Sequence, residues 1–187
     1  MAERLNRAVV VDRATDLADS IGWEELTITK LGRALGIAPP GVYRHVTDLD
    51  DLRRAISQKA AREVAVVLSA ACAGLSGRDA LAALAHALRG WAENHPARYA
   101  ALQIAPDPDD TEGISAADEL IAVIASGLRA YNLSGDDLTD AIRLIRSTLH
   151  GFIALELGDG FKQARATSVT FERIISALDT VLRAWSS

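Results

Sequence analysis

Residues 27–52 constrain the fold of this chain more than any other stretch. Their sequence predicts two short helices, Lys30–Leu35 and Pro40–His45, joined by a tight turn. Gly36 permits the left-handed backbone that ends the first helix, and Pro40 suits a helix start because its missing N–H would have no partner there. A second helix this short is not stable alone and must be held by its neighbours. The pattern indicates a helix-turn-helix, whose second helix enters the major groove of DNA.

The candidate DNA contacts lie on this motif. Arg44 is the candidate for reading a base edge, because its guanidinium group can bridge O6 and N7 of guanine. Thr29 and Lys30 lie where helix N–H groups and a cation can meet a backbone phosphate, and either Thr27 or Thr29 can cap that helix. The other candidates either reach a phosphate or let the backbone approach the groove: Tyr43, His45, Pro40 and Gly41. The alternative for His45 is a ring that is partly packed.

A set of apolar, glycine, proline and aromatic positions in the first third of the chain forms a pattern: Ala14, Leu17, Leu26-Thr27, Leu31, Leu35-Gly36-Ile37, Pro40, Val42-Tyr43, His45-Val46 and Leu52. With these residues, this part of the chain resembles the DNA-binding domain of the tetracycline-repressor (TetR) family of transcriptional regulators. One departure is Leu49, where the family usually has a lysine, so one phosphate contact that the resemblance implies is absent here.

The remaining sequence predicts an all-α protein. Apolar residues recur at three- and four-residue spacing from residue 5 to 21 and again in successive segments after residue 74. No stretch shows the two-residue alternation of a half-buried strand, and aromatic residues make up only 5% of the chain. Asp48, Asp50 and Asp51 begin a long helix to about Ala73, which we expect to connect two domains. We therefore predict a DNA-binding domain over residues 1–47 and a helical body over residues 48–187.

Charge and motifs exclude several other function classes. The net charge is −5, but residues 1–62 carry ten Lys or Arg against nine Asp or Glu, which is compatible with DNA binding. No H-E-x-x-H, paired-cysteine or serine-elbow motif is present, so we expect no enzyme activity, metal or cofactor. The single Cys72 excludes an internal disulfide, no signal peptide begins the chain, and no apolar run reaches ~20 residues. These features predict a cytoplasmic protein.

The resemblance implies that the body binds a small molecule. Residues 148–156 also resemble a histidine-glycine signature in one subgroup of TetR C-terminal domains. Arg146 and His150 lie four residues apart, so we expect both to point inward. The candidates combine aromatic walls with a few polar groups, a mixture typical of ligand clefts, although plain core packing is the alternative for each. They are Trp91, Tyr99, Gln103, Ile124, Leu128, Arg146 and His150.

Two long helices near the C-terminus, over residues 134–157 and 167–185, have strong apolar stripes. Such stripes either fill the core of their own subunit or pair with a second copy, and the resemblance favours a four-helix dimer interface. The predicted interface residues are Leu138, Ile142, Ile145, Leu149, Phe171, Ile174, Ile175, Leu178 and Leu182.

The function predicted from these observations is sequence-specific transcriptional regulation. We expect a homodimer that binds a near-palindromic operator in double-stranded DNA and represses until a small-molecule effector releases it. The alternative is a helical DNA-binding regulator that binds no small molecule and responds to a protein partner. A plain helical interaction module without DNA contact is a third, different class.

Overall fold

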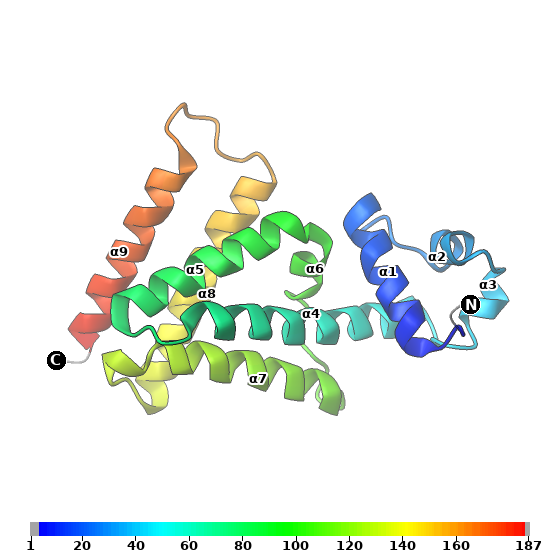
Figure 1. Cartoon of the computed structure of the whole chain (residues 1–187), viewed down its shortest axis with the longest axis horizontal. Helices are drawn as coiled ribbons and strands as arrows, with labels where there is room; N and C mark the ends of the chain where they lie inside the picture. Colours follow the sequence, from blue (N-terminus) through cyan, green and yellow to red (C-terminus); the bar gives the residue numbers. More distant parts are fainter. Residues whose placement is uncertain (1–3, 186–187) are drawn as a thin grey trace. The chain divides into compact units, whose positions relative to one another are not determined.

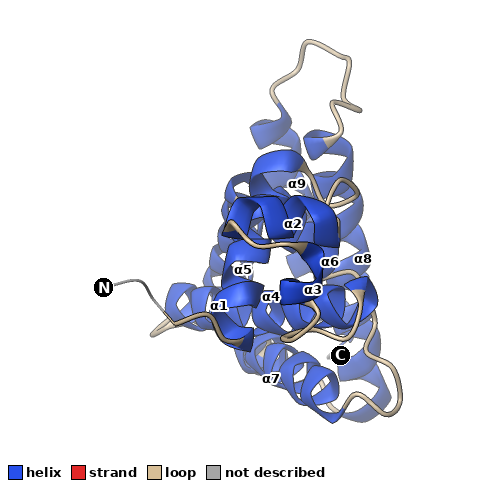
Figure 2. Cartoon of the chain, turned by 90° about the vertical axis from the view of Figure 1, so that its right-hand side faces the viewer, coloured by secondary structure: helices blue, strands red, loops and turns tan. Residues whose placement is uncertain are grey.

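The computed structural model describes residues 4–185, and every regular element in this range is a helix (Figure 2), as the sequence predicts. No helix in this range is long and apolar enough to cross a membrane. The elements in chain order are α1 (Arg7–Ile21), α2 (Ile28–Leu35), α3 (Pro39–Val42), α4 (Leu49–Cys72), α5 (Gly77–Asn94), α6 (Pro96–Ala101), α7 (Thr111–Gly127), the 3-10 turn η1 (Arg129–Tyr131), α8 (Gly135–Leu157) and α9 (Thr167–Trp185).

The chain forms two compact units. Unit 1 contains the described residues up to Glu63 together with Asn94–Ala117, and unit 2 contains Val64–Glu93 and the described residues from Asp118 onward. This division differs from the predicted boundary between residues 47 and 48. Helix α4 begins just after that point, at Leu49, and contributes its first half to the core of unit 1, and α6 packs against α1.

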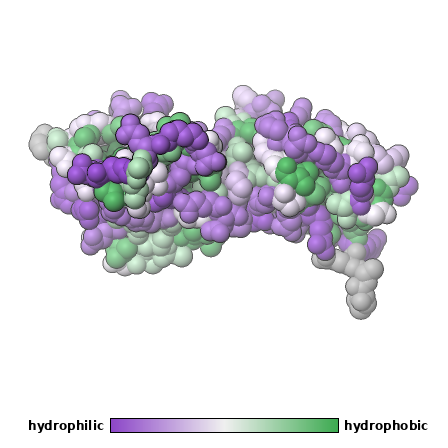
Figure 3. All heavy atoms as spheres, turned by 90° about the horizontal axis from the view of Figure 1, so that it is seen from above, coloured by the Kyte–Doolittle hydropathy of each residue, from purple (hydrophilic) through white to green (hydrophobic). Residues whose placement is uncertain are grey.

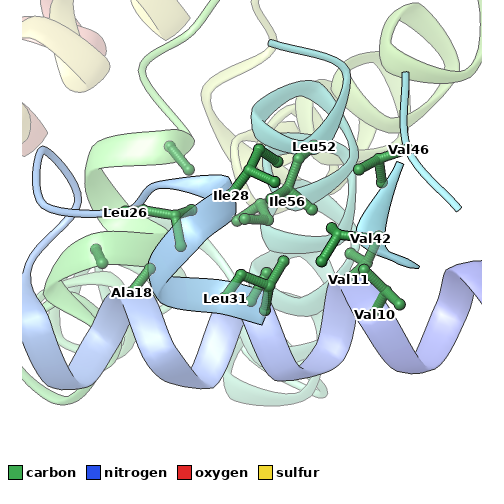
Figure 4. Close-up of a cluster of buried hydrophobic side chains, with 13 residues drawn as sticks. Val10, Val11, Ala18, Leu26, Ile28, Leu31, Val42, Val46, Leu52 and Ile56 are labelled. Atoms are coloured by element: carbon green, nitrogen blue, oxygen red, sulfur yellow. The ribbon is translucent and has the colours of Figure 1, made fainter. Parts of the chain in front are cut away.

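The core of unit 1 unites the three helix-turn-helix elements with α4 and α6 (Figure 4). Helices α1 and α2 pack against each other, as do α2 and α3, and Figure 1 shows these elements grouped together. Asn6 caps α1 by accepting a hydrogen bond from the backbone N–H of Val9. The buried side chains are Val10, Val11, Ala14, Ala18, Leu26, Ile28, Leu31, Val42, Val46, Leu52, Ile56, Ala97 and Ala101.

Helix α2 begins at Ile28 and α3 at Pro39, two residues and one residue before the predicted starts, and α3 is shorter than predicted. Thr27 caps α2 by accepting from the N–H of Lys30 at 3.2 Å, and Gly36 ends it with φ of 70°. The predicted second helix reached His45, whereas α3 ends at Val42. The backbone turns there because the N–H of His45 bonds the Val42 carbonyl at 2.9 Å, while the carbonyl of His45 accepts from a side chain of α1.

Charged contacts attach α6 to α1 and α4 inside unit 1. The Arg98 guanidinium lies 2.8 Å from Asp16, 2.8 Å from Asp19 and 3.1 Å from Glu63. Asp19 also accepts from the backbone N–H of Ala97 at 3.1 Å, where α6 begins. Side chains 35 to 82 residues apart along the chain therefore make α6 part of unit 1.

Helix α7 begins at Thr111. Asp110 accepts from the N–H of Gly113 at 2.9 Å and so caps a helix that starts at Thr111. The Gln58 amide of α4 donates to both carboxylate oxygens of Asp110, at 2.9 and 3.1 Å. Ser115 is therefore within the helix and is not its cap.

Helices α5, α8 and α9 contribute the main core of unit 2. The rings of Phe152 in α8 and Phe171 in α9 lie with centroids 5.0 Å apart. Arg89 of α5 places its guanidinium 5.0 Å from the Phe171 ring centroid and forms two hydrogen bonds of 2.7 Å to Glu156. This pair connects α5 to α8, because a guanidinium bonded to a carboxylate at both nitrogens fixes distance and orientation together.

We expect Gly32→Ala to destabilise unit 1 by about 1–3 kcal/mol, because overpacking a tight contact forces the backbone to move. An added Cβ would lie 2.9 Å from the Ile37 carbonyl oxygen and 3.5 Å from Val42 Cγ2. Chemical denaturation checks the loss. The control is Gly90→Ala in α5, whose Cβ would meet nothing within 4 Å, and which should be neutral or stabilising by about 0.5–1 kcal/mol. Equal stability of the two variants would contradict close crossing at Gly32.

Candidate nucleic-acid interface

The residues predicted to reach DNA from the second helix lie on α3 and on the turn after it. Pro40 and Gly41 belong to α3, and Gly41 lies against Ile37, where an added Cβ would approach Cδ1 to 3.2 Å. Tyr43 ends the helix with 53% of its surface exposed, and Arg44 is also exposed. The aromatic and basic side chains that could read a groove therefore project from a turn and not from the helix itself.

Thr29 and Lys30 lie in the first turn of α2, where the sequence places them. Thr29 is exposed, and 42% of the Lys30 side chain is exposed. The Lys30 ammonium pairs with the Glu25 carboxylate, and this contact lowers the pKa of Glu25. A DNA phosphate at this position would replace the Glu25 carboxylate as the anionic partner of Lys30. Glu25 was not identified from the sequence, and its spacing from Lys30 gives no helical signal because it precedes α2.

His45 is half-buried, and its backbone is held by a pair of charged side chains. The Arg7 guanidinium donates to the His45 carbonyl at 3.0 Å and to the two oxygens of Asp51 at 2.7 and 2.8 Å. The guanidinium of Arg7 is therefore bound to a carboxylate in this structure. Asp51 was expected only to favour the positive end of α4, and no sequence pattern joins it to Arg7, 44 residues away.

The seven predicted ligand residues do not fall in one unit. Trp91 and Leu128 are buried in unit 2, at 7% and 1% exposure, and Ile124 and His150 are half-buried there. Tyr99 and Gln103 belong to unit 1, where the Gln103 amide donates to the Tyr99 carbonyl at 3.1 Å.

The prediction that Arg146 points inward is wrong. Arg146 is exposed, because the buried face of α8 runs through Ile145 and Leu149 and the next residue lies about 100° around the helix. An open polar cleft in unit 1, between the start of α4 and residues 107–112, is lined by none of the seven predicted ligand residues.

The predicted dimer residues divide into core and surface. Leu138, Ile142 and Ile174 are half-buried. The other six are at most 4% exposed in the single chain and fill the core of unit 2, so they cannot present a surface to a partner: Ile145, Leu149, Phe171, Ile175, Leu178 and Leu182. The strongest apolar stripe of α8 and of α9 therefore packs within its own subunit. This corrects the prediction that these six residues form the dimer interface.

A second stripe on each helix remains on the surface. On α9 it contains Val181 and Trp185, each 39% exposed, with exposed Ala177 and half-buried Ile174. On α8 the stripe contains Leu144, Thr148, Gly151 and Leu155, of which Leu155 is 52% exposed. Both stripes follow the three- and four-residue spacing of one helical face. Elsewhere, the face of the molecule in Figure 3 is largely hydrophilic with smaller apolar areas.

The described residues contain no group of three or more His, Cys, Asp or Glu side chains placed to hold a metal ion. Cys72 is half-buried, and desolvation raises the pKa of its thiol, which keeps the thiol protonated. Its Sγ lies 3.5 Å from the Ala80 carbonyl. These features agree with a structural role for Cys72.

Residues 81–178 match the family described as "Tetracyclin repressor-like, C-terminal domain". The chain is 36% identical over 155 residues to an uncharacterized HTH-type transcriptional regulator of Mycobacterium tuberculosis, and the match covers 82% of this chain and 71% of that protein. The fold of this chain matches that of BioQ, which was solved with its natural double-stranded DNA operator. The TM-score is 0.65 and the identity 22%, and the match covers 97% of this chain and 99% of BioQ. The fold also matches the Q116A variant of TetR from Acinetobacter baumannii in complex with minocycline, with a TM-score of 0.74, 17% identity and coverage of 98% and 99%. The chain therefore belongs to the TetR family of helix-turn-helix transcriptional regulators and is not an enzyme.

Proposed function

We propose that this regulator binds a near-palindromic operator as a homodimer in the cytoplasm and represses transcription until a small molecule releases it. Unit 1, which includes residues 1–47, reads the DNA. Unit 2 supplies the dimer contact and the effector site.

The observation that carries the DNA part is the exposed turn Tyr43-Arg44 at the end of α3. Its aromatic hydroxyl and guanidinium project from an element whose apolar side, Val42 and Val46, is buried. Thr29, which is exposed, and Lys30, which is partly exposed, can make a second set of contacts with the phosphate backbone. BioQ, which has the same fold, was solved on its operator. Two such motifs related by a two-fold axis would dock about one helical turn, ~34 Å, apart.

The effector part is supported by the mixture of groups in unit 2. Trp91 and Leu128 are buried apolar side chains, Ile124 is a half-buried one, and half-buried His150 adds a polar group. A TetR variant of the same fold was solved with minocycline. A bound molecule can release DNA only if it binds one conformer more tightly than the other, so the effector must favour the conformer that does not fit the operator. We retain Trp91, Ile124, Leu128 and His150 as the effector site and omit Arg146.

We propose that the two surface stripes form the dimer contact. Ala177, Val181 and Trp185 of α9 would pack against their copies together with Gly151 and Leu155 of α8. Small residues such as Gly151 and Ala177 let helices approach closely, and an added Cβ at Gly151 meets nothing within 4 Å in the single chain. Two helices from each subunit then complete a four-helix arrangement.

The experiment that tests this function is selection of bound duplexes from a random pool by the full chain. A screen for compounds that release the selected duplex then follows. We expect one enriched near-palindrome whose binding weakens as salt rises. Failure to retain any duplex at low salt would reject DNA binding. Selection without any releasing compound would favour regulation by a protein partner.

We expect Lys30→Gln to reduce the slope of log affinity against log salt by about one unit, because one phosphate contact releases about 0.9 counterion. Fluorescence anisotropy with the selected duplex at several salt concentrations measures the slope. The control is Lys162→Gln, which removes the same charge from an exposed loop of unit 2. An unchanged slope in Lys30→Gln would show that Lys30 stays with Glu25 when DNA binds.

Arg44→Gln should lower discrimination at one base pair of each half-site by about 1–3 kcal/mol, while the other positions keep their preference. Repeating the selection with the variant measures this. Arg33 is exposed on α2 and provides the matched control Arg33→Gln, which should leave the selected sequence unchanged. If the Arg44 variant selects the parent site at full stringency, Arg44 does not read a base.

Val181→Glu should raise the dimer dissociation constant roughly a hundredfold or more, because a carboxylate in an apolar interface loses hydration without gaining a partner. Analytical ultracentrifugation measures the constant. Thr180→Glu places the same charge on the neighbouring exposed position, outside the stripe, and should leave the dimer intact. A wild-type dissociation constant in Val181→Glu would place the dimer contact elsewhere.

A further inference from the structure

The segment that follows α3 is held by a pair of charged side chains that the proposed DNA contacts do not include. Helix α3 contains only four residues, Pro39–Val42, so its own hydrogen bonds cannot fix its orientation. Its end must be fixed by tertiary contacts. Val46 supplies an apolar one, since it is only 2% exposed and packs in the core of unit 1 (Figure 4).

The polar contacts come from Arg7 and Asp51. Arg7 Nη2 donates to Asp51 Oδ1 at 2.7 Å, and Nη1 donates to Oδ2 at 2.8 Å. Each partner also binds the backbone between α3 and α4. Arg7 Nη1 donates to the His45 carbonyl at 3.0 Å, and Asp51 Oδ2 accepts from the Thr47 N–H at 2.8 Å. The pair therefore satisfies one acceptor and one donor of the segment that follows Tyr43 and Arg44.

Arg7 and Asp51 each lie in the first turn of a helix that other contacts hold in place. Arg7 is the first residue of α1, and the adjacent Val10 and Val11 of that helix are buried. Asp51 lies in the first turn of α4, where its backbone N–H donates to Asp48 Oδ1 at 2.7 Å. The hydrogen bond from Arg7 lowers the pKa of Asp51 to about 2, so the carboxylate stays ionised and loses this contact only as the pH falls toward that value.

We propose that Arg7 and Asp51 are positioning residues for DNA recognition: by holding the His45 carbonyl and the Thr47 N–H they fix the direction in which Tyr43 and Arg44 project. Neither side chain touches the DNA in this account. The inference rests on the proposed DNA-binding role of this turn, but the hold on the backbone can be measured without DNA.

The proposal predicts that removing a negative charge from Asp51 weakens DNA binding, which is the opposite of the usual effect. Replacing a surface carboxylate near phosphates by a neutral amide ordinarily strengthens DNA binding, because it removes repulsion. Asp51→Asn should weaken binding instead, since it loosens the turn that presents Arg44. Arg7→Gln should weaken binding to a similar degree while leaving the salt slope unchanged, because no phosphate contact is lost.

The experiment compares four full-length variants with the parent on the duplex that the parent selects. We expect Asp51→Asn and Arg7→Gln each to lower affinity about tenfold, the effect of losing one hydrogen bond to a charged group. The double variant should be no weaker than either single one, since both remove the same contact. The matched control is Asp50→Asn on the same turn of α4, whose exposed carboxylate makes none of these contacts. It should bind DNA as tightly as the parent or more tightly.

Amide hydrogen exchange without DNA provides the second measurement. In Asp51→Asn and Arg7→Gln the amides of residues 43–47 should exchange faster than in the parent, while those of α1 and α2 keep their protection. If Asp51→Asn fails to fold, Arg7→Lys is the variant that tests the proposal. Lysine keeps the positive charge but lacks the planar guanidinium group that donates to Asp51 and His45 together. This variant should give the same local acceleration.

Three results would overturn the proposal. Asp51→Asn could bind the selected duplex as tightly as the parent or more tightly. Arg7→Gln could lower the salt slope by about one unit with unchanged exchange, which would make Arg7 a phosphate contact. Exchange of residues 43–47 could stay at the parent rate in every variant. A parent protein that binds no duplex would instead reject the proposed function, and the exchange data would still test the hold on the backbone.

Discussion

The rest of unit 1 depends on how a four-residue helix is held in place. Helix α3 contains one backbone hydrogen bond of the α type, from Tyr43 N–H to the Pro39 carbonyl at 3.2 Å, and this cannot maintain a recognition surface. Its position comes from neighbours: Val42 and Val46 are buried, Gly32 allows close approach of the preceding turn, and two charged side chains hold the backbone that follows. Orientation of the reading residues is therefore a property of the packed unit.

This dependence explains why unit 1 extends beyond the helix-turn-helix. Helix α6 lies more than thirty residues after the motif, yet Ala97 and Ala101 complete the same apolar core. Arg98 adds contacts to three carboxylates from α1 and α4, and its side chain is only 15% exposed. Removing α6 would uncover part of this apolar core and take away the Arg98 contacts, so residues 1–47 alone lack part of what fixes their structure.

Much of the fold follows from local sequence. Gly36 and Thr27 mark the two ends of α2, and the three-and-four periodicity gives the helices of both units. The errors arise where residues distant in sequence decide the outcome. Helix α3 stops at Val42, and Arg7, 38 residues away from His45, binds the carbonyl of that residue in the turn that follows. Helix α7 starts at Thr111, where Asp110 caps it and is itself bound by Gln58 from 52 residues away.

The candidate site shows the same limit. Periodicity correctly identified which face of α8 and α9 is apolar, but it cannot say whether that face meets its own subunit or a partner. Phe171 and Leu182 meet their own subunit, and the weaker stripe with Val181 is the exposed one. For Arg146, four-residue spacing from His150 indicated a shared face, but the buried centre of α8 lies elsewhere. Arg44 is exposed, as a residue that reads a base must be, but its contact with DNA stays a prediction.

Hydroxyl-radical footprinting of the protein tests the central claim most directly, because tyrosine rings react in proportion to their exposure. Tyr43 is 53% exposed in the free chain, and Phe161, 40% exposed in the loop between α8 and α9, serves as an internal reference. Modification of Tyr43 should fall sharply when the protein is saturated with its selected duplex, while that of Phe161 stays constant. Equal modification of Tyr43 with and without bound DNA would contradict the account.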